Sequence, residues 1–137
     1  MNLVVCLDDR NGMAFAGKRQ IMDRLLRKQI LRLSQGSVLW MNAYSAMQFS
    51  EPAAHIRVAE DFMQKADKGQ FCFAENEDIA PYADEVEKLI LYRWNRSYPY
   101  DTVLPQVFTG EGWRRVDCFD FAGYSHDTIT QEVYVRC

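Results

Sequence analysis

The chain has 137 residues, of which 48% are hydrophobic and 26% are charged, and its formal net charge is −3. This length and composition predict one folded domain, spanning residues 1–137, whose core needs no metal or disulfide. The slightly acidic charge disfavours general nucleic-acid binding, so nucleic acid is not expected as a partner. No apolar run approaches the ~18 residues of a membrane span, so no membrane partner is expected.

The cysteines and histidines exclude further classes of protein. The four cysteines are Cys6, Cys72, Cys118 and Cys137. They form no C-x-x-C pair, and we interpret them as small buried hydrophobic residues in a reducing compartment. The first residues also lack the features of a signal peptide, so a cytoplasmic location is expected. His55 and His126 are too few for a zinc or two-metal site, and no metal is expected.

The first half of the chain alternates predicted strands and helices. Apolar runs predict strands at Asn2–Leu7, Ser37–Met41, Ile56–Val58 and Gln70–Ala74. We expect a loop over Met13–Ile21, and then a helix that begins after the N-cap Asp23 and ends near Gly36. Shorter helices are predicted over Asn42–Ser50 (ended by Pro52), Glu60–Ala66 and Asp78–Val86.

Strands dominate the second half. They are predicted at Lys88–Trp94, at Asp101–Leu104 and in an antiparallel hairpin formed by Trp113–Phe121 and Ile129–Arg136. His126 lies in the turn of this hairpin and is expected to be exposed. The order of elements predicts an α/β fold: a mixed sheet, mostly parallel with an antiparallel C-terminal hairpin, flanked by helices.

Basic residues are concentrated near the N-terminus. Residues 10–32 contain seven Lys or Arg side chains and a single acid, Asp23. Three interpretations remain open: a solvated helix face, an anion site where a loop enters a helix N-terminus, or pairing with the acidic segment Glu75–Glu87, within one chain or between two chains.

Several stretches resemble the dihydrofolate reductase family. The segment from Asn2 to Asp23 is similar to that family's first strand and the mobile loop over its active site, and Gly36–Met41 is similar to its second strand. Asp101–Pro105 resembles the family's Asp-Thr-x-Phe-Pro motif. The resemblance implies a dihydrofolate-reductase-like fold, with Asp23 as the nearest match to the single active-site acid and so the candidate catalytic residue.

Two departures from the family concern its cofactor. The Gly-Arg-x-Thr turn that would follow the second strand reads Met41-Asn-Ala-Tyr44 here, without the phosphate-binding arginine. A Gly-Gly pair that lets the backbone approach the cofactor is replaced by Glu75 and Asn76, and a carboxylate would repel a pyrophosphate. We therefore expect no cofactor and no folate reduction, with NADPH as the alternative.

Polar residues that such a fold would bring to one cleft form the candidate ligand site. They are Arg19, Gln20, Asp23, Asn42, Tyr44, Ser45, Glu75 and Asn76. Ligands bind beyond the carboxyl ends of strands in open α/β sheets, which is where Asn42 and Glu75 are expected. Alternative roles remain: Tyr44 in the core, Ser45 as a helix cap, and Glu75 with Asn76 as caps of the acidic helix.

The favoured functional prediction is binding of a small anionic ligand, a nucleotide or a phosphorylated metabolite, without folate reduction. Whether the chain is an enzyme is left open. A divergent NADPH-dependent reductase is one alternative. A protein interaction module or homodimer that uses the basic loop and helix is the other.

Overall fold

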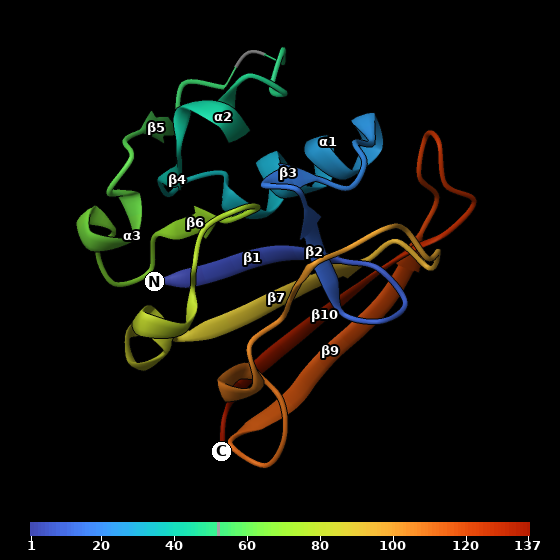
Figure 1. Cartoon of the computed structure of the whole chain (residues 1–137). Helices are drawn as coiled ribbons and strands as arrows, with labels where there is room; N and C mark the ends of the chain where they lie inside the picture. Colours follow the sequence, from blue (N-terminus) through green and yellow to red (C-terminus); the bar gives the residue numbers. More distant parts are fainter. Residues whose placement is uncertain (52) are drawn as a thin grey trace.

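The computed structural model describes residues 1–51 and 53–137, and within them a seven-stranded sheet has the order β5-β4-β6-β1-β7-β10-β9 (Figure 1). Its strands are β1 (Asn2–Leu7), β4 (Leu39–Met41), β5 (Ile56–Val58), β6 (Phe71–Phe73), β7 (Lys88–Arg93), β9 (Trp113–Phe121) and β10 (Ile129–Arg136). In this spatial order, the neighbours among β5, β4, β6, β1 and β7 pair in parallel, whereas β10 pairs antiparallel with both β7 and β9. The predicted fold class is confirmed.

A small second sheet lies across the carboxyl ends of the central strands (Figure 1). It consists of β2 (Gly12–Phe15), β3 (Lys18–Arg19) and β8 (Thr102–Val103). The prediction of a loop over Met13–Ile21 is therefore wrong in part. Ala16 and Gly17 both have positive φ angles, 52° and 75°, and so make the two-residue turn that joins β2 to β3.

The helices are shorter than the sequence pattern predicts. They are α1 (Arg24–Ser34), α2 (Ala43–Ala46), α3 (Phe62–Lys65) and the 3₁₀ helices η1 (Ala80–Glu85) and η2 (Gln106–Phe108). Pro81 in the first turn of η1 fits a helix start, where its missing N–H costs no hydrogen bond. The expectation that Pro52 ends a helix falls outside the described residues. Among these residues, no helix has the length and apolar character needed to cross a bilayer.

Side chains alternate between two core layers on the faces of the sheet. Val4, Phe73 and Ile90 point to the layer that α1 covers through Leu26 and Ile30. On the other face, a second layer packs beneath α3, η1 and η2. Because successive side chains of a strand point to opposite faces and both faces are buried here, the central strands are continuously apolar.

The expected burial of the cysteines is correct for only part of the set. Cys72 is fully buried, Cys6 is partly buried, and Cys118 and Cys137 are exposed. Cys118 lies on β9, and β9 is the edge strand of the sheet, so most of its side chains face solvent. All four cysteines are unpaired.

Candidate functional site

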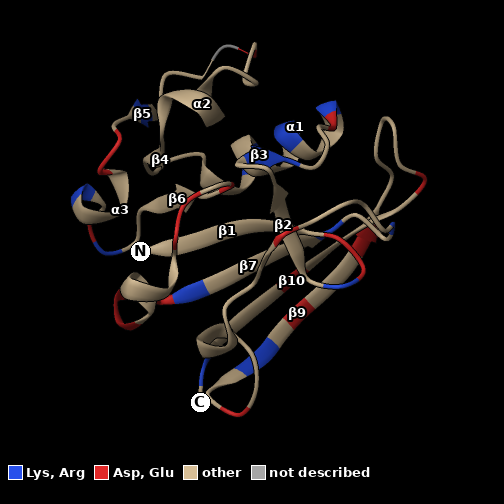
Figure 2. Ribbon diagram, in the orientation of Figure 1, with Lys and Arg blue, Asp and Glu red and all other residues tan. Residues whose placement is uncertain are grey.

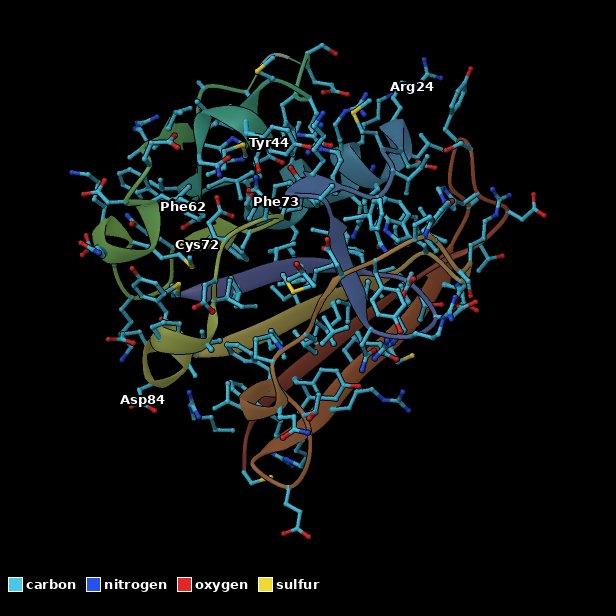
Figure 3. The ribbon with its side chains drawn as sticks, viewed as in Figure 1. Arg24, Tyr44, Phe62, Cys72, Phe73 and Asp84 are labelled. Atoms are coloured by element: carbon cyan, nitrogen blue, oxygen red, sulfur yellow. The ribbon has the colours of Figure 1, made fainter. Side chains whose placement is uncertain are left out.

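Residues from three elements meet where β4 and β6 end. Asn42 follows β4 and is the N-cap of α2, and Glu75 comes two residues after β6. β3 places Arg19 over the same edge of the sheet. Tyr44, labelled in Figure 3, belongs to α2 and contacts β3. The sequence prediction that Asn42 and Glu75 follow strand ends is thus confirmed.

Arg19 and Glu75 form a two-pronged ion pair. Arg19 Nε and Nη2 donate to the two Glu75 carboxylate oxygens at 2.9 and 3.1 Å. The exposed fractions of the two side chains are 18% and 8%. A paired geometry of this kind is directional as well as charged, so it holds both side chains in place.

Tyr44 holds Arg19 at three points. Its ring lies under the guanidinium at 4.1 Å, and its backbone oxygen accepts a hydrogen bond of 3.0 Å from Arg19 Nη2. Its hydroxyl accepts from the Arg19 backbone N–H at 2.9 Å. Tyr44 is therefore a member of this cluster rather than a core residue.

Ser45 and Asn42 connect the ion pair to the start of α2. Ser45 is fully buried, and its Oγ donates to Glu75 at 2.8 Å. The Asn42 side chain accepts from the Ser45 N–H at 2.8 Å, which is the N-cap bond, and donates to Asn76 and Glu77. The cap of α2 is thus Asn42 and not Ser45. Burial raises the pKa of Glu77, which accepts from Asn42, and the charge of nearby Glu75 adds to the rise.

The side chains of Gln20 and Asn76 connect the site to neighbouring loops. Asn76 Nδ2 donates to the Gly17 backbone oxygen at 3.0 Å. Gln20 Nε2 donates to Asp8 at 3.3 Å and to the Pro99 backbone oxygen at 3.2 Å. Both of those partners are acceptors, so the amide orientation of Gln20 is fixed. Its Oε1 is buried and has no hydrogen-bond partner among the described residues.

The space between these residues is small. A cavity of about 10 Å³ is lined by Cys6, Met13, Arg19, Gln20, Ile21, Ala74, Glu75 and Trp94. That volume admits about one water molecule. Burial, and secondarily the Glu75 charge, raises the pKa of the Cys6 thiol well above its usual range, which favours the neutral thiol over the thiolate. With the Arg19–Glu75 pair formed, the cavity has no room for a ligand larger than water.

Asp23 makes none of its hydrogen bonds with this cluster. Its fully buried carboxylate accepts from the backbone N–H groups of Leu25, Leu26, Tyr124 and Ser125, from Ser125 Oγ and from His126 Nδ1. Burial opposes ionisation, but these donors outweigh it and hold the pKa of Asp23 well below its usual range. An acid that stays ionised is a poor proton donor, so Asp23 acts here as the α1 cap.

His126 is the residue whose role the sequence did not reveal. It is 3% exposed, so the expected exposure is wrong. Its ring stacks on Trp94 with 4.7 Å between centroids, and its Nε2 lies 2.7 Å from the Tyr98 hydroxyl. Since ionised Asp23 can only accept, Nδ1 carries a proton and donates it to Asp23. Within the described residues, no group of three or more His, Cys, Asp or Glu side chains is placed to hold a metal.

The residues at the start of α2 do not fit the pyrophosphate of a dinucleotide. The Ala43 N–H already donates to the Glu60 carboxylate at 3.0 Å, so the helix terminus has an anionic partner from the chain. Glu75 and Glu77 add two more carboxylates beside Asn42. Glu75 and Asn76 follow β6, and a glycine, which would let a phosphate approach the backbone, is absent from these two positions.

Comparison with known proteins assigns the fold. No family model matches the chain, and no curated protein matches it in sequence. Among solved structures, the chain is similar to a dihydrofolate reductase from Enterococcus faecalis complexed with NADP(H) and RAB-propyl, with a TM-score of 0.68 and 12% identity. The match covers 98% of this chain and 95% of that one. The chain therefore has the dihydrofolate reductase-like fold.

Proposed function

We propose that the chain binds a small ligand that carries both an anionic group and a hydrogen-bond donor, a nucleotide or phosphorylated metabolite, and does not reduce folate. The observation that carries this proposal is that a forked donor and an unused acceptor line the same cavity. The donor is Arg19, and the acceptor is the buried Gln20 Oε1, which has no partner among the described residues. An unsatisfied buried acceptor is costly, and a ligand donor would satisfy it.

In the proposed bound state the ligand takes the place of one member of the ion pair. Its anionic group binds the Arg19 guanidinium in place of the Glu75 carboxylate, and its donor group donates to Gln20 Oε1. Tyr44 keeps the guanidinium in position through its ring and backbone oxygen. The ligand-free protein thus holds the site closed with its own carboxylate. Arg19, Gln20, Asn42, Tyr44, Glu75 and Asn76 are the residues proposed for this site.

Calorimetric titration with adenosine 5′-monophosphate tests the proposal, because this probe carries a phosphate and an amino group. Adenosine, which lacks the phosphate, is the matched probe. Arg19→Gln should lower the affinity for the monophosphate by about tenfold or more, since a charged hydrogen bond is lost. Glu75→Gln should raise it, because the competing carboxylate is removed.

Lys28→Gln is the control, since Lys28 is exposed on α1 and its substitution changes the net charge equally. Equal binding of adenosine and its monophosphate, or unchanged affinity in Arg19→Gln, would contradict the proposal. We place this binding in the cytoplasm, where unpaired cysteines remain reduced.

The basic surface of α1 supports a second candidate, an interaction with an acidic partner or a second copy of the chain. Figure 2 shows Lys and Arg grouped on α1. Arg24 points away from the core (Figure 3) and lies 4.3 Å from the Tyr124 ring centroid. Sedimentation at low and high salt tests this candidate: an association through these charges should weaken as salt rises, and a sedimentation rate that stays monomeric at low salt would contradict a homodimer.

A further inference from the structure

A second hollow lies on the face of the sheet opposite α1. Its volume is about 250 Å³, and it opens between β7, the β9–β10 hairpin and the segment that contains η2. Its floor includes Leu91, whose neighbour Ile90 points to the α1 side. The hollow is therefore separate from the cluster around Arg19 and Glu75.

Aromatic and aliphatic side chains form part of the walls. Phe108 and Trp113 lie with ring centroids 6.1 Å apart, and Leu91, Leu104 and Tyr134 also line the hollow. The Trp113 indole N–H donates to the Val107 backbone oxygen at 3.0 Å, which fixes the ring. Small-molecule sites are typically apolar and aromatic hollows with a few oriented polar groups.

Arg93 also lines the hollow, together with the polar residues Asn11 and Thr109. Its Nε donates to Glu132 at 2.9 Å and its Nη1 to Asn11 at 2.8 Å. Its Nη2 makes no hydrogen bond with any described residue. The guanidinium is thus oriented by two bonds and keeps one nitrogen available for a further acceptor.

Positive charge exceeds negative charge around the hollow. Glu132 is shared between Arg93 and Arg115, whose Nη1 lies 3.5 Å from it. The guanidinium of Arg136 lies 4.4 Å from the Trp113 ring centroid. Two arginines therefore share one carboxylate and a third lies beside Trp113, and Figure 2 shows basic residues at the end of β9 that lies beside the chain's C-terminus.

We propose that this hollow binds a small aromatic carboxylate. The ring would pack against the exposed edges of Phe108, Trp113 and Tyr134, and the carboxylate would accept from Arg93 Nη2. The volume is below the roughly 300–1,000 Å³ of sites for drug-sized ligands, which limits the ligand to one ring with a short substituent. The excess of arginine favours an anion over a neutral aromatic molecule.

Titration of the full chain with benzoate tests this proposal, with benzyl alcohol and acetate as matched probes. Benzoate should bind saturably, and benzyl alcohol should bind about tenfold or more weakly, because it lacks the charged hydrogen bond. Acetate should show no saturable binding, since it lacks the ring. Arg93→Gln should reduce the benzoate affinity about tenfold and leave the benzyl alcohol affinity unchanged.

A second variant keeps the test independent of the Arg93–Glu132 pair. Thr109 lines the hollow and is exposed, so Thr109→Trp should fill the entrance and abolish binding of both aromatic probes without removing a charge. Lys28→Gln on α1 and Arg19→Gln in the other site should leave benzoate binding unchanged. Absence of saturable benzoate binding at millimolar concentration, equal affinity for benzoate and benzyl alcohol, or wild-type binding by Thr109→Trp would overturn the proposal.

Discussion

Asp23 at the start of α1 accepts a hydrogen bond of 3.1 Å from Nδ1 of His126, which lies 103 residues later between β9 and β10. The Tyr124 and Ser125 backbone N–H groups donate to the same carboxylate at 2.9 Å. One buried acid therefore caps a helix and fastens a distant hairpin end to it. The β9–β10 connection is thus a structural partner of α1.

Gly123→Ala should destabilise the protein by about 1–3 kcal/mol, because the added methyl group overpacks the contact between the hairpin end and α1. A Cβ at this position would meet the Asp23 Oδ2 and the His126 backbone oxygen at 2.8 Å each. Urea unfolding measures the change. Gly112→Ala is the matched control, since nothing lies within 4 Å of its Cβ position. Equal stability of the two variants would contradict the close approach of Gly123 to Asp23.

Stability should fall as the pH is lowered below about 4, the ordinary pKa of an aspartate in an unfolded chain. The pKa of Asp23 is lower in the folded protein, so its contribution is fully present above the unfolded pKa and is lost as the pH falls through the folded one. Urea unfolding between neutral and acidic pH measures this loss.

Asp23→Asn supplies the comparison for that titration. The amide cannot ionise, so the variant should be less stable at neutral pH and its stability should depend less steeply on pH in the acidic range. A wild-type acid dependence in Asp23→Asn would assign the effect to other carboxylates.

The parts of the fold that were predicted correctly depend on local patterns. The apolar runs of β1 and β7 and the alternation in the C-terminal hairpin identify the sheet. Burial on two faces gives a continuous apolar run, and burial on one face gives alternating apolar and polar residues. The N-cap Asp23 was also predicted, since a cap depends on its immediate neighbours.

The wrong expectation for His126 depends on contacts between distant segments. The burial of His126 requires the hairpin end to fold back onto α1 and Trp94, and no local pattern reports this. The sequence did suggest that the basic segment pairs with acidic residues from Glu75 onward. The Arg19–Glu75 ion pair is one such contact, but its forked geometry and the role of Tyr44 depend on the β2–β3 turn.

Leu26→Ala should lower the free energy of unfolding by roughly 2–5 kcal/mol, the range for truncating a fully buried leucine. Leu26 is 3% exposed and packs with Ile30 against the sheet. Chemical denaturation gives the difference. Lys28→Ala, on the exposed face of the same helix, is expected to change stability by less than about 0.5 kcal/mol. A similarly small loss for Leu26→Ala would show that α1 does not pack through this face.

NADPH should not bind tightly, even though the solved structure to which the chain is similar contains NADP(H). The start of α2 is already satisfied by Glu60, and Glu75 and Glu77 lie beside it, so a pyrophosphate would meet like charges. Fluorescence titration of NADPH measures the affinity, and the double substitution Glu75→Gln with Glu77→Gln should strengthen any weak binding by removing this repulsion. Micromolar or tighter binding by the wild-type chain would support the reductase alternative instead, because it would show that the cofactor reaches the sheet edge despite these carboxylates.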